Sequence, residues 1–153
     1  MSLYNTILDD LKTSMKAKDE LRTLVLRSLK AAMLEKEISA RTEGKAVSVS
    51  DEMATEVIVK AAKQRRDSIT QFDQAGREDL AENERKELAI IESYLPEQLS
   101  EDDIRSIVDE AIQQTDAESM RDMGKVMGKV MPKVKGKADG GLVNSIVKER
   151  LLS

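Results

Sequence analysis

The sequence predicts an all-α protein in two parts, an N-terminal helical bundle or hairpin followed by a small three-helix domain. Its 153 residues include only two prolines and three aromatic residues. Alanine, leucine, methionine, glutamate, lysine and arginine are used heavily, and all of them favour helices. Apolar residues recur every three or four positions, which is the period of a helix packed on one side.

Two helices are predicted in the first forty residues, from Leu3 to about Lys16 and from about Glu20 to Ala40, with Asp19 as the N-cap of the second. Apolar residues that share one face of a helix are expected to be buried. In the first helix these are Tyr4, Ile7, Leu8, Leu11 and Met15. In the second they are Leu21, Leu24, Val25, Leu29, Ala32 and Ile38.

A loop around Gly44 is predicted to lead into a third helix, which Ser50 caps and which ends near Ala75. Gly76 then supplies a left-handed C-terminal position. A fourth helix is predicted from about Glu78 to Tyr94, where Pro96 stops it. The apolar residues expected inside are Met53, Val57, Ala61, Ile69 and Phe72 in the third helix and Leu80, Leu88, Ile91 and Leu95 in the fourth.

Pro96 to Leu99 is the predicted boundary between a domain of residues 1–95 and a domain of residues 99–153. A helix breaker, a change of charge and a new cap at Ser100, with Asp103 three residues on, coincide there. The second domain is predicted to hold three helices, about Glu101 to Gln114, Glu118 to Met131 and Gly140 to Leu152, the last capped by Asp139.

Charge is distributed unevenly along this acidic chain. The net charge is −4, but residues 97–120 carry net −7 and residues 121–153 carry net +5. A positive surface on an acidic protein is therefore expected at the C-terminal end. Cysteine and histidine are absent from the sequence, so thiol and imidazole chemistry are excluded, and we expect no cofactor and no metal site. Without a long apolar run or a signal-peptide start, the sequence predicts a soluble cytoplasmic protein.

The segment from Met123 to Gly141 concentrates lysine and glycine, and it is the strongest indication of function. On a helix, Met123, Val126, Met127, Val130 and Met131 share one face, and a basic, glycine-containing face lies opposite. Spaced cations with little bulk between them suit the phosphates of a folded RNA. The predicted nucleic-acid-binding residues are Arg121, Gly124, Lys125, Gly128, Lys129, Lys133, Lys135, Lys137 and Gly140.

The same segment has other interpretations. A solvated lysine face, with glycines that allow helices to cross closely, explains it equally well from the residues alone. The spacing of Gly124 and Gly128 matches a membrane helix-dimer motif, but the adjacent lysines exclude a lipid setting. Gly136 and Lys137 do not form a nucleotide-binding loop, because Met131 occupies the position of the required glycine.

A second basic surface is predicted on the third helix, formed by Lys60, Lys63, Gln64 and Arg66. It would extend an RNA surface or meet a protein, although charges on a solvated helix explain it too. The acidic cluster at residues 101–103 is interpreted as a complement to a helix N-terminus rather than a metal site.

Several motifs resemble the YqeY-like family of small bacterial proteins over essentially the whole chain. They are Lys63-Gln64-Arg65-Arg66-Asp67-Ser68, Phe72, Ala75-Gly76-Arg77, Asp79-Leu80, Tyr94-Leu95-Pro96 and Asp122-Met123-Gly124-Lys125-Val126-Met127. The C-terminal third also resembles the tail domain of the B subunit of the tRNA-dependent glutamine and asparagine amidotransferases. The matching positions are Gly124, Lys125, Gly128, Lys129, Lys133, Gly136, Lys137, Asp139 and Gly140.

The resemblance implies an all-helical, two-part fold and a role related to tRNA. It also implies a family label of carbon–nitrogen ligase with glutamine as amide donor, although no kinase-like or amidase-like segment accompanies the tail here. The sequence therefore predicts a non-catalytic RNA-interaction protein that binds tRNA through the C-terminal domain. The alternatives are a protein-interaction adaptor and an accessory subunit of an amidotransferase. No membrane partner is expected, and the oligomeric state is left open.

Overall fold

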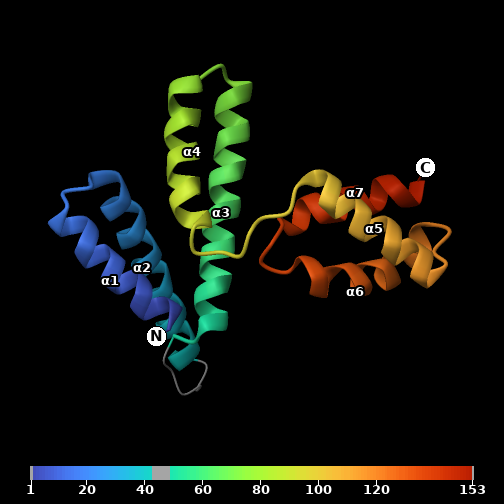
Figure 1. Ribbon diagram of the computed structural model, residues 1–153, viewed down its shortest axis with the longest axis horizontal. Helices are drawn as coiled ribbons and strands as arrows, with labels where there is room; N and C mark the ends of the chain where they lie inside the picture. The colour runs from blue at the N-terminus through green and yellow to red at the C-terminus, as the bar shows by residue number, and fades with distance from the viewer. Residues whose placement is uncertain (1, 43–48, 153) are drawn as a thin grey trace. The chain divides into compact units, whose positions relative to one another are not determined.

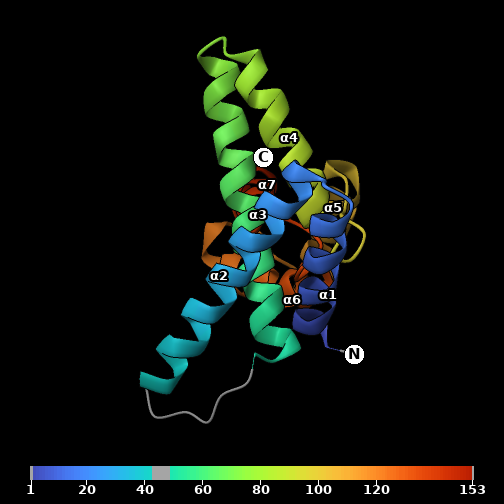
Figure 2. The same ribbon diagram turned by 90° about the vertical axis from the view of Figure 1, so that its left-hand side faces the viewer.

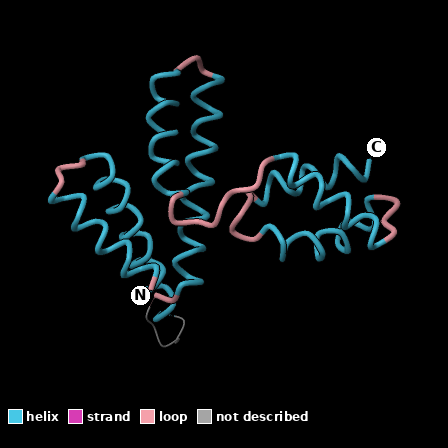
Figure 3. The backbone as a smooth tube through the Cα atoms, viewed as in Figure 1, coloured by secondary structure: helices cyan, strands magenta, loops and turns pink. Residues whose placement is uncertain are grey.

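The computed structural model describes residues 2–42 and 49–152, and all of their regular structure is helical (Figures 1 and 3). The chain divides into two compact units, Met1–Leu95 and Pro96–Ser153. Each unit has its own cluster of buried apolar side chains. The predicted all-α class is therefore confirmed. The predicted loop around Gly44 lies outside the described residues.

The N-terminal unit begins with two helices that pack along each other, α1 (Leu3–Lys16) and α2 (Glu20–Thr42). Ser2 caps α1, because its hydroxyl accepts a hydrogen bond from the Asn5 backbone N–H at 3.1 Å. The predicted cap of α2 is confirmed, since the Asp19 carboxylate accepts from the Arg22 N–H at 3.1 Å. In Figure 2, α2 runs in front of the next helix of the chain, α3 (Asp51–Gln74).

A second helical pair completes this unit, α3 (Asp51–Gln74) and α4 (Glu78–Glu92). As predicted, the Ser50 hydroxyl caps α3 by accepting from the Met53 N–H at 3.2 Å. Gly76 lies between the two helices with a φ of +72°, the left-handed conformation that favours glycine. Figure 1 shows α3 and α4 as the green pair, side by side.

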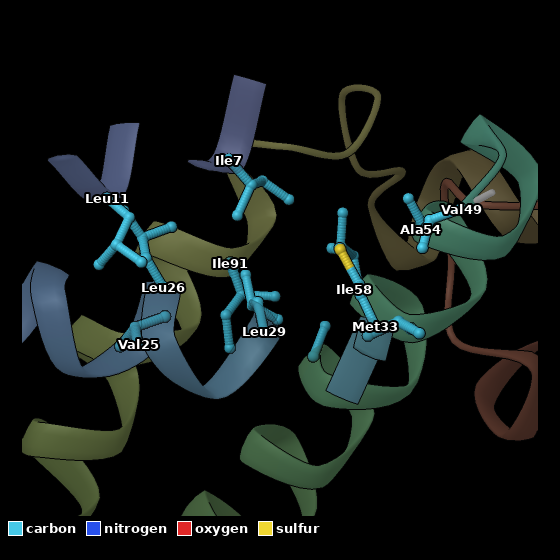
Figure 4. Close-up of a cluster of buried hydrophobic side chains, with 12 residues drawn as sticks. Ile7, Leu11, Val25, Leu26, Leu29, Met33, Val49, Ala54, Ile58 and Ile91 are labelled. Carbon is cyan, nitrogen blue, oxygen red and sulfur yellow. The ribbon is translucent and has the colours of Figure 1, made fainter. Parts of the chain in front are cut away.

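The N-terminal core lies where these two pairs meet (Figure 4). Ile7 of α1, Leu29 of α2 and Ile91 of α4 are at most 2% exposed and lie near one another in the figure. Ile58 of α3 and Met33 of α2 extend the same cluster and are fully buried. Burial of such side chains contributes roughly 1.5–3 kcal/mol each, so this cluster is what holds the four helices together.

The C-terminal unit contains α5 (Glu101–Thr115), the 3-10 turn η1 (Met120–Asp122), α6 (Met123–Val134) and α7 (Gly140–Leu152). Ser100 and Asp103 form the predicted capping box at the start of α5. The three helices pack on one another around a second apolar cluster. Its buried members are Ile104, Val108, Ala111, Val126, Val130, Val134, Val143, Ile146, Val147 and Leu151.

Several predicted inward positions are wrong. Met15, Leu24 and Ile38 are 50%, 60% and 62% exposed, and Leu80 is 37% exposed. The apolar residues of α2 occupy two opposite sides of the helix, and only the side with Val25, Leu26, Leu29 and Met33 faces the core. In α4, Ala81 and Glu87 take the buried places instead of Leu80.

The boundaries of α6 also differ from prediction. The helix starts at Met123 rather than Glu118, because Ser119 and Asp122 form a capping box around the preceding turn. It continues through Pro132 to Val134, so Val134 is buried and Met131 is 37% exposed. Because proline has no backbone N–H, α6 lacks the hydrogen bond that residue 132 would otherwise donate to the Gly128 carbonyl.

Candidate nucleic-acid interface

The basic face predicted for residues 121–129 is present on α6 and the turn before it. Val126 and Val130 are fully buried, whereas Gly124, Lys125, Gly128 and Lys129 are exposed. Arg121 lies in η1 and is exposed as well. One side of this short helix therefore packs on α5 and α7, and the opposite side presents Lys125, Lys129 and the two glycines to solvent, with Arg121 exposed on the preceding turn.

The remaining predicted lysines follow the same helix and its connection to α7. Lys133 lies in the last turn of α6, and Lys135 and Lys137 lie in the connection; all three are exposed. Gly136, between them, has a φ of +77°. Gly140 is the first residue of α7 and is also exposed. All nine predicted site residues thus belong to one unit, along η1, α6 and the start of α7.

The connection between α6 and α7 is fastened to the start of the unit. The Leu99 N–H donates to the Lys137 carbonyl at 2.8 Å, and the Gln98 side-chain amide donates to the Gly136 carbonyl at 3.0 Å. These bonds fix the backbone that carries Lys135 and Lys137. Gln98 is a residue that sequence reasoning did not connect to the site, because nothing in the sequence pairs positions 98 and 136.

The exposed glycines of α6 are not required by packing within the described chain. A methyl group added at Gly124 or Gly128 would meet no atom within 4 Å beyond the helix's own backbone, and the same holds at Gly140. Neither Gly124 nor Gly128 has a positive φ. Glycine inside a helix costs roughly 0.5–1 kcal/mol relative to alanine. Close helix crossing within this unit therefore does not explain the two glycines.

Ion pairing separates the cations of this unit into two groups. Arg105 of α5 lies 3.7 Å from Glu149 of α7, and Arg150 of α7 lies 3.2 Å from Asp109 of α5. These arginines link the two helices. Among the described residues, no salt bridge is formed by the predicted site cations. Those six cations are Arg121, Lys125, Lys129, Lys133, Lys135 and Lys137.

Asp122 is an acidic residue next to the basic face, and it has a structural role. Its carboxylate accepts hydrogen bonds from the backbone N–H groups of Glu118 at 2.9 Å and Ser119 at 3.4 Å. These bonds lower the pKa of Asp122, and the nearby charges of Lys125 and Arg121 lower that pKa further. The carboxylate therefore stays ionised and holds the turn that positions Arg121. The Ser-x-x-Asp spacing of residues 119–122 was the available sequence signal for it.

The second predicted surface, on α3 of the N-terminal unit, is less uniformly basic. Lys60, Lys63 and Gln64 are exposed, but Arg66 lies 3.2 Å from Glu92 of α4. The adjacent Arg65 lies 3.2 Å from the buried Glu87. Lys60, Gln64 and Arg65 also line a groove of about 470 Å³ between α2 and α3.

Acidic groups share that groove. Glu35 and Glu56 line it, and Glu56 pairs with Lys36 at 2.7 Å. Mixed charge distinguishes this surface from the face on α6.

In the part of the chain that the structure describes, no group of three or more acidic residues forms a metal-binding arrangement. None of the described helices has the length and apolar character needed to cross a bilayer.

The chain is similar to yeast proteins named "Altered inheritance of mitochondria protein 41, mitochondrial". The Kluyveromyces lactis protein is 36% identical over 85 residues, which are 56% of this chain and 44% of the relative. The Lachancea thermotolerans protein is 42% identical over 87 residues, covering 56% and 44%. The Candida glabrata protein is 33% identical over 101 residues, covering 63% and 53%. The chain spans about half the length of these relatives.

These relatives contradict two predictions, a bacterial source and a cytoplasmic location, because they are yeast proteins with mitochondrial names. The location was predicted because the sequence has neither a long apolar run nor a signal-peptide start. The start of a sequence that covers about half of its relatives does not decide a compartment.

The family prediction rested on motifs spread from residue 63 to residue 127, and a match to the family of Yqey-like proteins extends over residues 4–151. The match covers nearly all of both units of the structure. The chain therefore belongs to the Yqey-like protein family.

Proposed function

We propose that the chain is a non-catalytic RNA-binding protein that holds folded RNA, with tRNA as the preferred class, against the basic face of its C-terminal unit. The supporting observation is the row of exposed cations that lack salt bridges within the described residues, beside arginines that have them. Lysines that neutralise phosphates release the counterions of the nucleic acid, which is a main source of affinity for nucleic acids.

The glycines support contact with a backbone rather than with bases. Gly124 and Gly128 place no side chain between the lysines, so a sugar–phosphate chain can approach the helix backbone closely. Aromatic residues are absent from residues 95–153, so stacking on unpaired bases is not available in this unit. Recognition would then depend on phosphate positions and the shape of a folded RNA.

Pro132 leaves one backbone carbonyl of α6 without its usual helical donor. In an α-helix, the carbonyl of Gly128 would accept a hydrogen bond from the backbone N–H of residue 132. Proline has no such N–H, so this carbonyl lacks its usual donor. A ribose 2′-hydroxyl is a donor of suitable size, and it distinguishes RNA from DNA. A preference for RNA over DNA of the same sequence is therefore part of the proposal.

The test is a titration of labelled, folded tRNA with the full chain, followed by fluorescence anisotropy at several salt concentrations. The test variant is Lys125→Ala/Lys129→Ala. The matched control is Lys12→Ala/Lys16→Ala, which removes two exposed lysines with the same spacing from α1. The test variant should weaken binding and lower the slope of log affinity against log salt by about two, roughly one for each lysine. The control should leave both unchanged.

Equal weakening by the two variants would mean that binding reflects only total charge, and the site would be rejected. An absence of saturable binding even at low salt would reject RNA as the ligand. The same face would then be assigned to a protein partner, as in the adaptor hypothesis.

A further inference from the structure

Helix α2 has an apolar face that the N-terminal unit does not cover. Leu24, Leu34 and Ile38 are 60%, 38% and 62% exposed, and Ala31 lies exposed among them. The opposite face of the same helix supplies Val25, Leu26, Leu29 and Met33 to the core. Exposed single apolar residues are ordinary, but four on one side of a helix form a stripe.

Two large residues of the stripe, Leu24 and Ile38, are placed symmetrically about Ala31. Leu24 precedes Ala31 by seven residues and Ile38 follows it by seven, so both lie about two turns away on the same side. The two large side chains are thus each roughly 10 Å along the helix from a small central residue. Ala31 allows another helix to approach closely at the centre, and the larger residues can pack on either side of the crossing.

Two residues of opposite charge on the same face lie at equal distances on either side of Ala31. Arg27 lies four residues before it and Glu35 four residues after it, and both are exposed. Neither forms a salt bridge within the described residues, whereas Lys36 and Arg41 of the same helix pair with Glu56 and Glu37. A cation on one side of the centre and an anion at the same distance on the other side complement a reversed copy of the same helix.

We propose that α2 pairs with α2 of a second copy of this chain, antiparallel, with the two-fold axis at Ala31. In this register Leu24 of each copy meets Ile38 of the other, and Arg27 meets Glu35 twice. A parallel arrangement would instead place Arg27 against Arg27 and Glu35 against Glu35, which like charges oppose. The sequence of the stripe thus selects both the partner and its direction.

The contact is small, so the dimer is weak and depends on concentration. Four side chains from each copy fall below the area of a standard stable interface. Sedimentation of the full chain up to the high micromolar range should therefore show a reversible monomer–dimer equilibrium. Arg27→Glu should raise the dissociation constant about tenfold, because two favourable charge contacts become two unfavourable ones.

The double variant Arg27→Glu/Glu35→Arg restores both pairs with the charges exchanged, and it should return the dissociation constant close to that of the original chain. Both positions are exposed, so the fold is expected to tolerate these changes; circular dichroism verifies this. A chain that stays monomeric at every concentration, or a double variant no better than Arg27→Glu, would overturn the proposal.

Cysteine cross-linking tests the register independently, since the native sequence has no cysteine. Ala31→Cys should form a cross-linked dimer with a short thiol reagent. Leu24→Cys alone should not, because its two copies would lie about 20 Å apart. A mixture of Leu24→Cys and Ile38→Cys chains should cross-link between unlike partners. Efficient cross-linking of Leu24→Cys with itself would reject the antiparallel arrangement.

Discussion

The hydroxyl of Tyr94 connects three segments of the N-terminal unit. It donates a hydrogen bond to the Asp10 carboxylate of α1 at 2.6 Å and accepts one from the Arg22 guanidinium of α2 at 3.1 Å. Tyr94 itself follows the end of α4. Burial raises the pKa of Tyr94 to about 12, and the hydrogen bond to Asp10 contributes to the increase.

We predict that Tyr94→Phe destabilises the N-terminal unit at neutral pH by roughly 1–3 kcal/mol, because it removes a hydrogen bond to a charged group and leaves Arg22 with one partner fewer. Chemical denaturation followed by circular dichroism measures this loss. A loss below about 0.5 kcal/mol would show that the hydroxyl contacts do not stabilise the fold.

The raised pKa also predicts a pH dependence. An unfolded tyrosine ionises near pH 10, whereas Tyr94 in the folded chain ionises at about 12. Its contribution to stability is therefore complete below pH 10 and is lost as the pH rises from 10 to about 12. Tyrosinate absorbance of the folded chain should lose this late titration in Tyr94→Phe and keep it in Tyr4→Phe. A late titration that persists in Tyr94→Phe would contradict the assignment.

At the scale of single helices, the ends were more predictable than the faces. Asp19, Ser50 and Ser100 begin helices as predicted, because a cap depends on a side chain and the backbone within three residues of it. Gly76 likewise has the predicted positive φ. These are local interactions, and the sequence contains all of their partners.

Which side of a helix is buried depends on residues that are far away in the sequence. The two apolar sides of α2 give no single direction, so Leu24 and Ile38 were wrongly placed inside. Glu87 is buried because Arg65 of α3 lies 3.2 Å away, and no local pattern contains that contact. The lysines of α6 were placed on the correct, exposed face because its valines mark one inner side.

The exposed glycines of α6 yield a prediction that separates stability from binding. Gly124→Ala and Gly128→Ala should each stabilise the C-terminal unit by roughly 0.5–1 kcal/mol, since alanine favours a helix and nothing obstructs the new methyl group. If RNA approaches this face closely, the same variants should weaken RNA binding despite the stabler fold. Thermal denaturation and anisotropy on the same samples measure the two effects. Unchanged RNA affinity would remove the glycines from the interface.

At the scale of the whole molecule, the chain has two separate cores. The apolar cluster of the N-terminal unit includes no residue beyond Leu95, and that of the C-terminal unit begins at Leu99, among the described residues. The capping box at Ser100 starts the C-terminal unit locally, and the bonds of Gln98 and Leu99 to residues 136–137 close it. The sequence predicted a helix break at Pro96, but it did not predict the hydrogen bonds from Gln98 and Leu99 to residues 136–137.

Separate cores predict separate unfolding. Ile58 in the N-terminal core and Ile146 in the C-terminal core are at most 1% exposed. Replacing either with alanine should cost roughly 2–5 kcal/mol through lost burial and a cavity. Amide hydrogen exchange of the full chain should then show faster exchange only in α1–α4 for Ile58→Ala and only in α5–α7 for Ile146→Ala.

The same pair of variants tests where RNA binds in the intact chain. Ile146→Ala loosens the unit that carries the basic face, so RNA affinity should fall and added RNA should restore exchange protection in α5–α7. Ile58→Ala should bind RNA with unchanged affinity, because the face on α6 depends on a core that does not contain Ile58. Faster exchange throughout the chain in both variants would show one cooperative molecule. RNA affinity lost only in Ile58→Ala would place the site in the N-terminal unit instead.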